Sequence, residues 1–448
     1  MNEEEKSLEE MAALLERAGN LDAAFTGKSP VFVTETDADA LILLEAGANA
    51  VAVGLYDKGA DTIRDYSGLL PDRAYIIADG TTFGEDAARG IKRAFEDRGK
   101  GAAIIHTPAP HESLKALYNS DKGLLQRLLQ GNAWEVYEYE QTTSAGAYID
   151  RFWDDVRAKT PAIQTGFSKL DEELGGGLYE GLYIIGAVSS LGKTTFCLQL
   201  ADQLAFIGND VIIFSLEMAR YELIAKSLSR LSVMLCQGAT KNAKTARALT
   251  DPDRIAQFDF VEQALIASAE KEYREFASHL WINEGLGTIG TEQIRDFIRK
   301  HIEIKGRAPI VFIDYLQILA SPDPRMTDKQ ATDRNVFELK RISREFKCPI
   351  IAVSSFNRDN YTAALNMAAF KESGAIEYSS DVLIGLQPMG MKAAGSDKEK
   401  AENARTLDSC KTAPERRIEL KVLKNRHGRT NGTIEYKYIP MFNWFDEA

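Results

Sequence analysis

The sequence predicts an α/β protein of two domains, the second of them built on a mostly parallel sheet. Short, uniformly apolar runs alternate with helical segments over most of the chain, the pattern of strands covered by helices on both faces. One of these runs leads through a glycine-containing loop into a helix. A length of 448 residues also exceeds what one hydrophobic core usually organises, so two or three domains are expected from the length alone.

The first domain is expected to be a small α/β unit over residues 28–130, preceded by a helical leader over 1–27. An amphipathic helix is predicted within the leader, over 3–18. The expected strands are 31–33, 50–53, 74–77 and 102–105, and the expected helices are 37–46, 85–97 and 113–130. Residues 131–160 are expected to be a linker, with a flexible stretch at 141–147 and a short helix at 149–157.

The second domain is expected to occupy residues 161–448. Its predicted strands are 183–186, 211–216, 310–314, 350–354, 382–386, 418–423 and 433–438. The stretch 390–412 is polar and rich in small residues, which predicts a mobile loop.

Composition limits the possible partners and compartment. A formal net charge of −12 gives no global attraction to nucleic acid, so any DNA contact requires a local basic surface. The four cysteines are widely spaced, which favours reduced thiols in the cytoplasm over a zinc site or disulfides. The acidic N-terminal stretch does not resemble a targeting peptide, and no apolar run approaches the length of a membrane span.

A phosphate-binding loop is predicted at residues 187–195, which read AVSSLGKTT between a strand and a helix. In such a loop, backbone N–H groups and the helix N-terminus face the phosphates of ATP. Lys193 would reach the β- and γ-phosphates and Thr194 would ligate Mg²⁺. The usual pattern opens with Gly where this chain has Ala187. The residues expected around the nucleotide are Ala187, Ser190, Gly192, Lys193, Thr194 and Thr195.

Two carboxylates follow predicted strands of the same sheet. Asp314 is placed to hold magnesium, often through water, although an Asp at a strand end can also cap a helix. Glu217 is the candidate for polarising the attacking water; the alternative is a solvated Glu at a helix start. Lys424 and Arg426, two residues apart on an extended segment, should project to one side. Taken alone, they favour solvated charge on an edge strand.

Several phrases of the second half together resemble the RecA-like motor domain of the DnaB family of replicative helicases. They are TGFSKLDEELGGGL (165–178), AVSSLGKTTF (187–196), FSLEM (214–218), IDYLQIL (313–319), SSFNR (354–358), KESGAIEYSSD (371–381) and LKNRHGRTNGT (423–433). They occur in the family's order over about 280 residues, and Ala at position 187 is usual in that family.

The resemblance implies a hexameric ring that hydrolyses NTP at subunit interfaces and translocates on single-stranded DNA, with a helicase loader or primase as further partners. It makes Glu217 the catalytic base, and Lys424 and Arg426 fingers acting in the neighbouring subunit's site. The loop from Lys371 to Gly374 would contact DNA, and the helix 149–157 would dock on an adjacent subunit. One departure is Ser355, where the family usually carries a Gln that senses the γ-phosphate.

Residues 30–105 resemble a Toprim fold, as found in bacterial primases and topoisomerases. Glu35 and Asp39 follow the first strand and Asp79 follows the third, a pattern that suits Mg²⁺. Family members carry a second Asp where this chain has Thr81, and residues 108–113 lack a further expected Asp. The resemblance therefore implies a degenerate Toprim module, in a layout similar to phage primase–helicases.

Alternatives remain open at the level of sequence. One is a bifunctional primase–helicase with an active Toprim site. Another is a recombination ATPase without sustained unwinding, since Gly175–Gly177 is also reminiscent of RadA- and KaiC-type ATPases. A third is a clamp or loader-interaction protein without catalysis.

Overall fold

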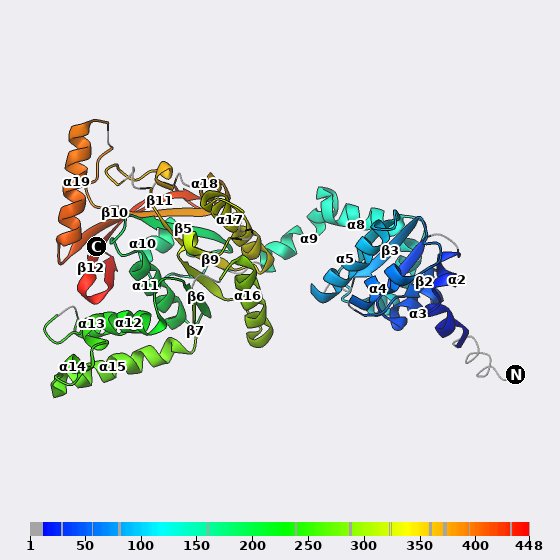
Figure 1. Ribbon diagram of the computed structural model, residues 1–448, viewed down its shortest axis with the longest axis horizontal. Helices are drawn as coiled ribbons and strands as arrows, with labels where there is room; N and C mark the ends of the chain where they lie inside the picture. The colour runs from blue at the N-terminus through cyan, green and yellow to red at the C-terminus, as the bar shows by residue number, and fades with distance from the viewer. Residues whose placement is uncertain are drawn as a thin grey trace. The chain divides into compact units, whose positions relative to one another are not determined.

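The computed structural model describes residues 12–447, except 28–29, 56, 79–81, 159–160, 238–239, 286–288, 322, 324, 358–360, 371–373, 394 and 431. The chain divides into two compact units, Met1–Lys159 and Thr160–Ala448 (Figure 1). None of the described helices combines the length and apolar character needed to cross a membrane.

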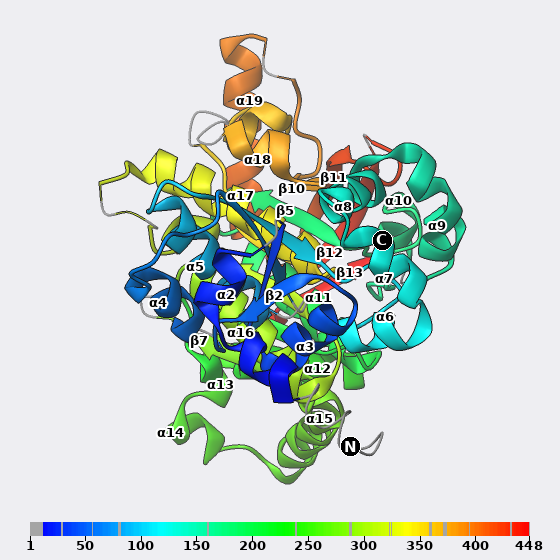
Figure 2. The ribbon, with the colours of Figure 1, turned by 90° about the vertical axis from the view of Figure 1, so that its right-hand side faces the viewer.

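The first unit, drawn in blue to cyan in Figure 1 and Figure 2, contains a parallel four-stranded sheet. The order of its strands is β2-β1-β3-β4. The strands are β1 (Val31–Thr34), β2 (Asn49–Ala52), β3 (Arg73–Ala78) and β4 (Gly101–His106). The helices are α2 (Leu21–Phe25), α3 (Asp37–Glu45), α4 (Asp57–Asp65), α5 (Thr82–Glu96), α6 (Leu114–Ser120), α7 (Lys122–Leu128), α8 (Ala133–Thr143) and α9 (Ala145–Ala158).

Alternation along the strands builds two cores in this unit. Val31 and Val33 pack with α2, α4 and α5 on one face of the sheet. Phe32, between them, packs with α3, α6, α7 and α8 on the other face. Successive strand side chains point to opposite faces, so a single apolar strand contributes to both cores.

All four predicted strands of the first unit are confirmed, but three helical expectations need correction. The helix expected over 113–130 is two helices, broken at Asp121, which caps α7. The stretch 141–147, expected to be flexible, is helical on both sides of Ser144. The short helix expected at 149–157 is the longer α9. Of the helix expected over 3–18, residues 12–18 are helical and residues 3–11 lie outside the described part.

The second unit contains a nine-stranded sheet in the order β13-β12-β11-β10-β5-β9-β8-β6-β7. The pairs from β10 to β7 are parallel, and β11, β12 and β13 are antiparallel. The strands are β5 (Gly181–Ala187), β6 (Val211–Ser215), β7 (Leu280–Glu284), β8 (Ile310–Asp314), β9 (Pro349–Ser355), β10 (Val382–Pro388), β11 (Arg416–Asn425), β12 (Thr433–Ile439) and β13 (Trp444–Glu447).

Helices cover this sheet, and a mostly helical segment, residues 220–277, connects β6 to β7 (Figure 1). The helices are α10 (Ser168–Glu173), α11 (Lys193–Phe206), α12 (Arg220–Leu235), α13 (Ala246–Leu249), α14 (Pro252–Ile255), α15 (Phe260–Ala277), α16 (Thr291–Lys305), α17 (Asp328–Glu345), α18 (Gly374–Ser379) and α19 (Asp397–Thr412).

The seven predicted strands of this unit are confirmed and two were missed. The missed strands, β7 and β13, form the two edges of the sheet and are short, and edge strands lack the uniformly apolar pattern of central ones. The expected mobile loop at 390–412 is wrong for most of its length, because residues 397–412 form α19. Ser396 and Glu399 make a capping box at its start, and the buried side chains Asn403 and Leu407 anchor it.

Candidate functional site

The loop after β5 has the backbone shape of a phosphate cradle. Gly192 caps α11 with φ 91°, and Ser190 also has a positive φ of 70°. A Cβ at Gly192 would lie 2.9 Å from the Tyr438 ring and 3.0 Å from the Phe445 ring, so only glycine fits. The N-terminal N–H groups of α11, with the positive end of its dipole, are therefore available at this loop for an anion.

Lys193 bends back over this loop. Its Nζ donates to the carbonyl oxygen of Ala187 at 3.0 Å and to the Ser355 hydroxyl at 3.3 Å. Burial lowers the pKa of Lys193, and the nearby Asp314 and Glu217 carboxylates oppose that shift. The half-buried ammonium has three N–H donors, so Lys193 can add phosphate oxygens to these neutral partners.

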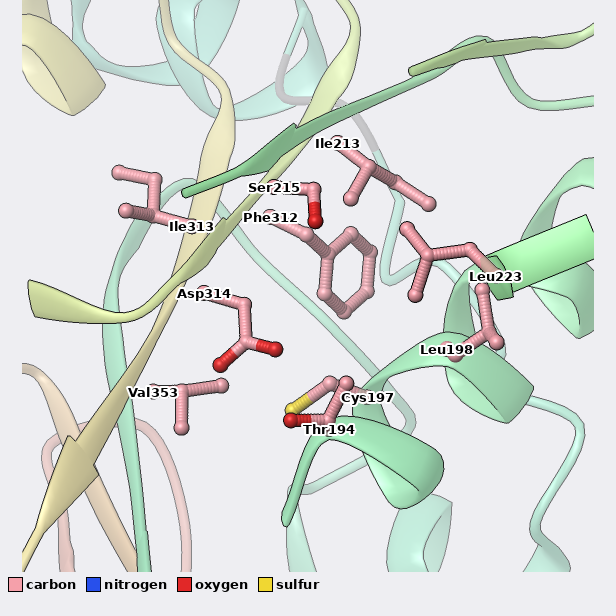
Figure 3. Close-up of a pocket in the computed structure, with 10 residues that line it drawn as sticks. All are labelled: Thr194, Cys197, Leu198, Ile213, Ser215, Leu223, Phe312, Ile313, Asp314 and Val353. Atoms are coloured by element: carbon pink, nitrogen blue, oxygen red, sulfur yellow. The ribbon is translucent and has the colours of Figure 1, made fainter. Parts of the chain in front are cut away.

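Asp314 and Thr194 meet at the end of β8, as Figure 3 shows. The Thr194 hydroxyl hydrogen-bonds the Asp314 carboxylate, and burial raises the pKa of that carboxyl while this bond lowers it. Both line a cavity of about 20 Å³, with room for about one water. A hydroxyl and a carboxylate are oxygen donors of the kind Mg²⁺ takes together with phosphates and water, so these two residues fit the ion.

The pairing of β6 with β8 places Glu217 close to Asp314. Ser215 of β6 lies opposite Asp314 of β8, and Leu216 N donates to Asp314 O at 2.9 Å. Glu217, two residues past that pair, raises the pKa of Asp314 electrostatically. The structure thus brings together Lys193, Thr194, Asp314 and Glu217 at the carboxyl ends of neighbouring strands. Ala187, Ser190, Gly192 and Thr195 lie in or beside the same loop.

Lys424 and Arg426 lie at the opposite end of the strands from the phosphate loop. Both donate to the carbonyl oxygen of Tyr378, at 3.2 and 3.0 Å, so they do project to one side. Asn425 pairs with Val382 at the start of β10, whereas the phosphate loop adjoins Leu386. Four residues of strand separate these levels by roughly 13 Å, so neither side chain faces its own phosphate loop.

The remaining predicted site residues are only partly described. Gly374 is exposed at the start of α18, and Lys371 lies outside the described residues.

In the first unit, Glu35 and Asp39 both line a cavity of about 90 Å³ at the carboxyl ends of β1 and β3. The Asp39 carboxylate accepts from Thr36 Oγ1 at 2.7 Å. Asp79 and Thr81 lie outside the described residues, and no metal-ligand group of three or more appears among the described ones.

Two basic residues at the site carried no signal in the sequence. Lys226 on α12 is partly buried, and burial lowers its pKa against the opposing effect of Asp314, Glu222 and Glu217. Arg416 begins β11 and donates to the carbonyl oxygen of Ser190 in the phosphate loop at 2.7 Å. A lysine in a helix and an arginine at a strand start normally read as solvated charge, so only the packing reveals these positions.

Comparison with known proteins places the second unit in a family. Residues 162–447 match the model of the DnaB-like helicase C terminal domain. Replicative DNA helicase DnaB of Helicobacter pylori strain J99 is 28% identical over 316 residues, covering 64% of this chain and 60% of that protein. Replicative DNA helicase DnaC of Bacillus subtilis is 28% identical over 291 residues, covering 63% and 56%. The chain thus spans less than two thirds of the length of these relatives.

Solved structures agree on the fold. A DnaB-like replicative helicase, determined with its interactions with primase, aligns with a TM-score of 0.54 and 19% identity, over 82% of this chain and 79% of that one. A separately solved ATPase domain aligns with a TM-score of 0.55 and 20% identity, over 68% and 99%. Because the family model covers well over half of the residues, this chain belongs to the family of the DnaB-like helicase C-terminal domain.

Proposed function

We propose that this protein is an ATP-hydrolysing DNA helicase of the replicative type, working as a ring on single-stranded DNA. The observation that carries the proposal is the convergence of Lys193, Asp314 and Glu217 at adjacent strand ends beside a helix N-terminus. That set of groups is what phosphoryl transfer requires, since its catalysis rests on positioning and charge stabilisation. Membership of the DnaB-like helicase family supports the use of ATP hydrolysis for movement along DNA.

Each residue has a defined task in this proposal. The amides of the loop and Lys193 hold the phosphates, and Thr194 and Asp314 hold Mg²⁺, which when bound neutralises charge on the β- and γ-phosphates. Glu217 orients a water toward the γ-phosphate and accepts its proton. Ser355, which contacts Lys193, occupies the position from which the γ-phosphate would be sensed.

Lys424 and Arg426 support an oligomer with shared sites. They lie at the other end of the strands from their own phosphate loop. Their charge can therefore stabilise a nucleotide only in the site of a neighbouring copy. In a closed ring, each subunit would supply Lys424 and Arg426 to the nucleotide site of the next, so that every site is complete. The proposed ring has six subunits. Within the ring, the segment from Lys371 to Gly374 would face DNA, and α9 would dock on an adjacent subunit.

The first unit is proposed to be a Toprim-like module that has lost catalysis and serves as an appendage for DNA, a loader or a primase. Its parallel sheet carries Glu35 and Asp39 where the strand order reverses, the usual place for a ligand. Thr81, which stands in place of a carboxylate, weakens a Mg²⁺ site there. The protein is proposed to work in the cytoplasm and to be encoded by a bacterium, a phage or a mobile element, since the relatives it resembles are bacterial.

Stimulation of ATPase by single-stranded DNA, followed by strand displacement on a forked duplex, tests this function. Both activities are expected in the wild type, and both should vanish in Lys193→Ala. DNA-stimulated ATPase without displacement on any fork would favour a recombination-type ATPase. No ATPase with or without DNA would overturn the motor assignment.

A further inference from the structure

A buried carboxylate, Asp381, lies beside the two cations that are proposed to act in the neighbouring site. Asp381 stands between α18 and β10, and its side chain is 4% exposed. The backbone N–H of Arg426 donates to the carbonyl oxygen of Asp381 at 3.0 Å, and Arg426 Nη1 lies 3.7 Å from Asp381 Oδ1. Burying a carboxylate costs free energy unless partners compensate it, so these partners indicate what the group does.

The second oxygen of this carboxylate is fixed by the body of the domain. Leu182 N, near the start of β5, donates to Asp381 Oδ2 at 2.7 Å, and Lys340 of α17 pairs with the same oxygen. A Cβ at Gly181 would lie 2.8 Å from Oδ2, so the glycine leaves room for the carboxylate. Because Oδ2 is bound from two sides, Oδ1 is the oxygen that faces Arg426.

The guanidinium of Arg426 is held by its own domain and still open to a ligand. Its Nη2 donates to Tyr378 O at 3.0 Å, and its Nη1 faces Asp381. The side chain is nevertheless 44% exposed. A guanidinium carries further N–H donors in a rigid plane, so these two contacts orient Arg426 and leave donors for phosphate oxygens.

Lys424 stands close to Arg426 and would repel it without an anion nearby. Its Nζ donates to Glu377 O at 2.6 Å and to Tyr378 O at 3.2 Å. Burial lowers the pKa of Lys424 and the charge of Arg426 lowers it further, whereas Asp381 opposes both effects. The buried carboxylate thus offsets the repulsion between two cations that are proposed to work together.

We infer that Asp381 is the positioning residue that orients Arg426, and with it Lys424, toward the nucleotide site of the neighbouring subunit. The inference rests on the proposed function, because it takes these two cations as groups that act across a subunit interface. Asp381 does not touch the nucleotide; it acts through Arg426, which it holds by a backbone hydrogen bond and by charge. The competing role is a purely structural one, as the partner of Lys340 and of the Leu182 N–H.

Asp381→Asn keeps the size of the side chain and the backbone acceptor for Arg426 but removes the charge. It should lower kcat for ATP about a hundredfold, the loss expected when a group that acts in the transition state is displaced by about 1 Å. Binding of a non-hydrolysable ATP analogue should stay as in the wild type, because Asp381 lies at the other end of the strands from its own phosphate loop. Glu262→Gln, which removes the charge of an enclosed carboxylate paired with Lys244, is the matched control and should turn over like the wild type. The readouts are steady-state ATPase with saturating single-stranded DNA and calorimetric binding of the analogue.

Mixing variants shows on which side of an interface Asp381 acts. Asp381→Asn mixed with Glu217→Ala should regain part of the ATPase, since a hybrid interface then joins an intact Glu217 to an intact Asp381 and Arg426. Asp381→Asn mixed with Arg426→Ala should regain none, because both defects lie on the side that supplies the cations. The reverse pattern would place the effect in the subunit's own phosphate site, through Leu182 and β5, and would overturn the inference.

A double variant separates positioning from stability. Asp381→Asn leaves Lys340 without its partner, which can unfold the protein, whereas adding Lys340→Met removes both charges. The double variant should melt close to the wild-type Tm and still lose kcat about a hundredfold. Wild-type kcat in the double variant would show that Asp381 serves only Lys340.

The outcomes also separate this inference from the function on which it rests. Wild-type turnover of Asp381→Asn beside an inactive Arg426→Ala would overturn the positioning role and leave the shared sites intact. Wild-type turnover of Arg426→Ala itself would overturn both.

Discussion

The Nζ atom of Lys193 lies 3.3 Å from the hydroxyl oxygen of Ser355, so the end of β9 holds the lysine of the phosphate loop. Register explains the contact, because Ser355 pairs with Ala187, the last residue of β5. The residue that departs from the family's Gln is therefore within reach of the group that would bind the γ-phosphate.

Ser355→Ala should lower kcat for ATP about tenfold. The variant removes one hydrogen bond to a half-buried ammonium, a contact of about 1.5–3 kcal/mol for a charged donor, while Ala187 still holds Lys193. Steady-state ATPase with saturating single-stranded DNA measures it, with Ser355→Thr as the variant that keeps the hydroxyl. Wild-type kcat in Ser355→Ala would show that this contact plays no part in turnover.

Lys193→Ala should reduce ATP hydrolysis by about a thousandfold or more, because a charge that stabilises the transferring phosphoryl group is lost. Single-turnover hydrolysis measures the loss. Lys400→Ala, which removes an exposed lysine paired with Asp397 on α19, is the matched control and should leave the rate unchanged. A Lys193→Ala protein with half of the wild-type rate would refute the phosphate-loop assignment.

Arg426→Ala should abolish ATPase while leaving nucleotide binding nearly intact, because Arg426 lies at the other end of the strands from its own phosphate loop. Mixing this variant with Glu217→Ala should restore part of the activity, since a hybrid interface can pair an intact Glu217 with an intact Arg426. The measurement is ATPase across mixing ratios, with each variant alone as control. Full activity of a demonstrably monomeric species would contradict shared sites.

The first unit should not synthesise primers. Without the carboxylate that Thr81 replaces, two-metal chemistry has too few anionic ligands. The assay is de novo oligoribonucleotide synthesis on a single-stranded template with Mg²⁺ or Mn²⁺. Primers that disappear in Glu35→Ala would instead establish a primase–helicase, and tighter Mg²⁺ binding by Thr81→Asp would support the stated cause.

The first unit should lose stability as pH rises through about 9. His106 at the end of β4 lies between Glu138 and Glu85, with each contact at 2.5 Å, and the bond to Glu138 contributes most to raising its pKa to about 9. Its ordinary pKa is 6.5, so this contribution is complete below that pH and is lost between 6.5 and 9. The Tm difference between wild type and His106→Gln should therefore be larger at pH 6 than at pH 10. An equal difference at both pH values would show that the histidine is not charged in the folded state.

The sequence determined the central strands and the phosphate loop because both depend on local pattern. Central strands such as β5 and β8 are buried on both faces and must be apolar throughout, and a loop ending in Gly192 and Lys193 is constrained by its own backbone. Position at a strand end then sufficed to place Asp314 and Glu217 on one edge of the sheet.

Tertiary structure alone decided the rest. The edge strands β7 and β13 are short and mix apolar with polar residues, and the polar segment that forms α19 was expected to be a loop, because all three are stabilised by what they pack against. The approach of Ser355 and Arg416 to the phosphate loop depends on strand order and register, which bring together residues more than 160 positions apart in the sequence. Contacts at that sequence separation leave no periodic signal, because each partner looks like ordinary polar surface until the sheet is assembled.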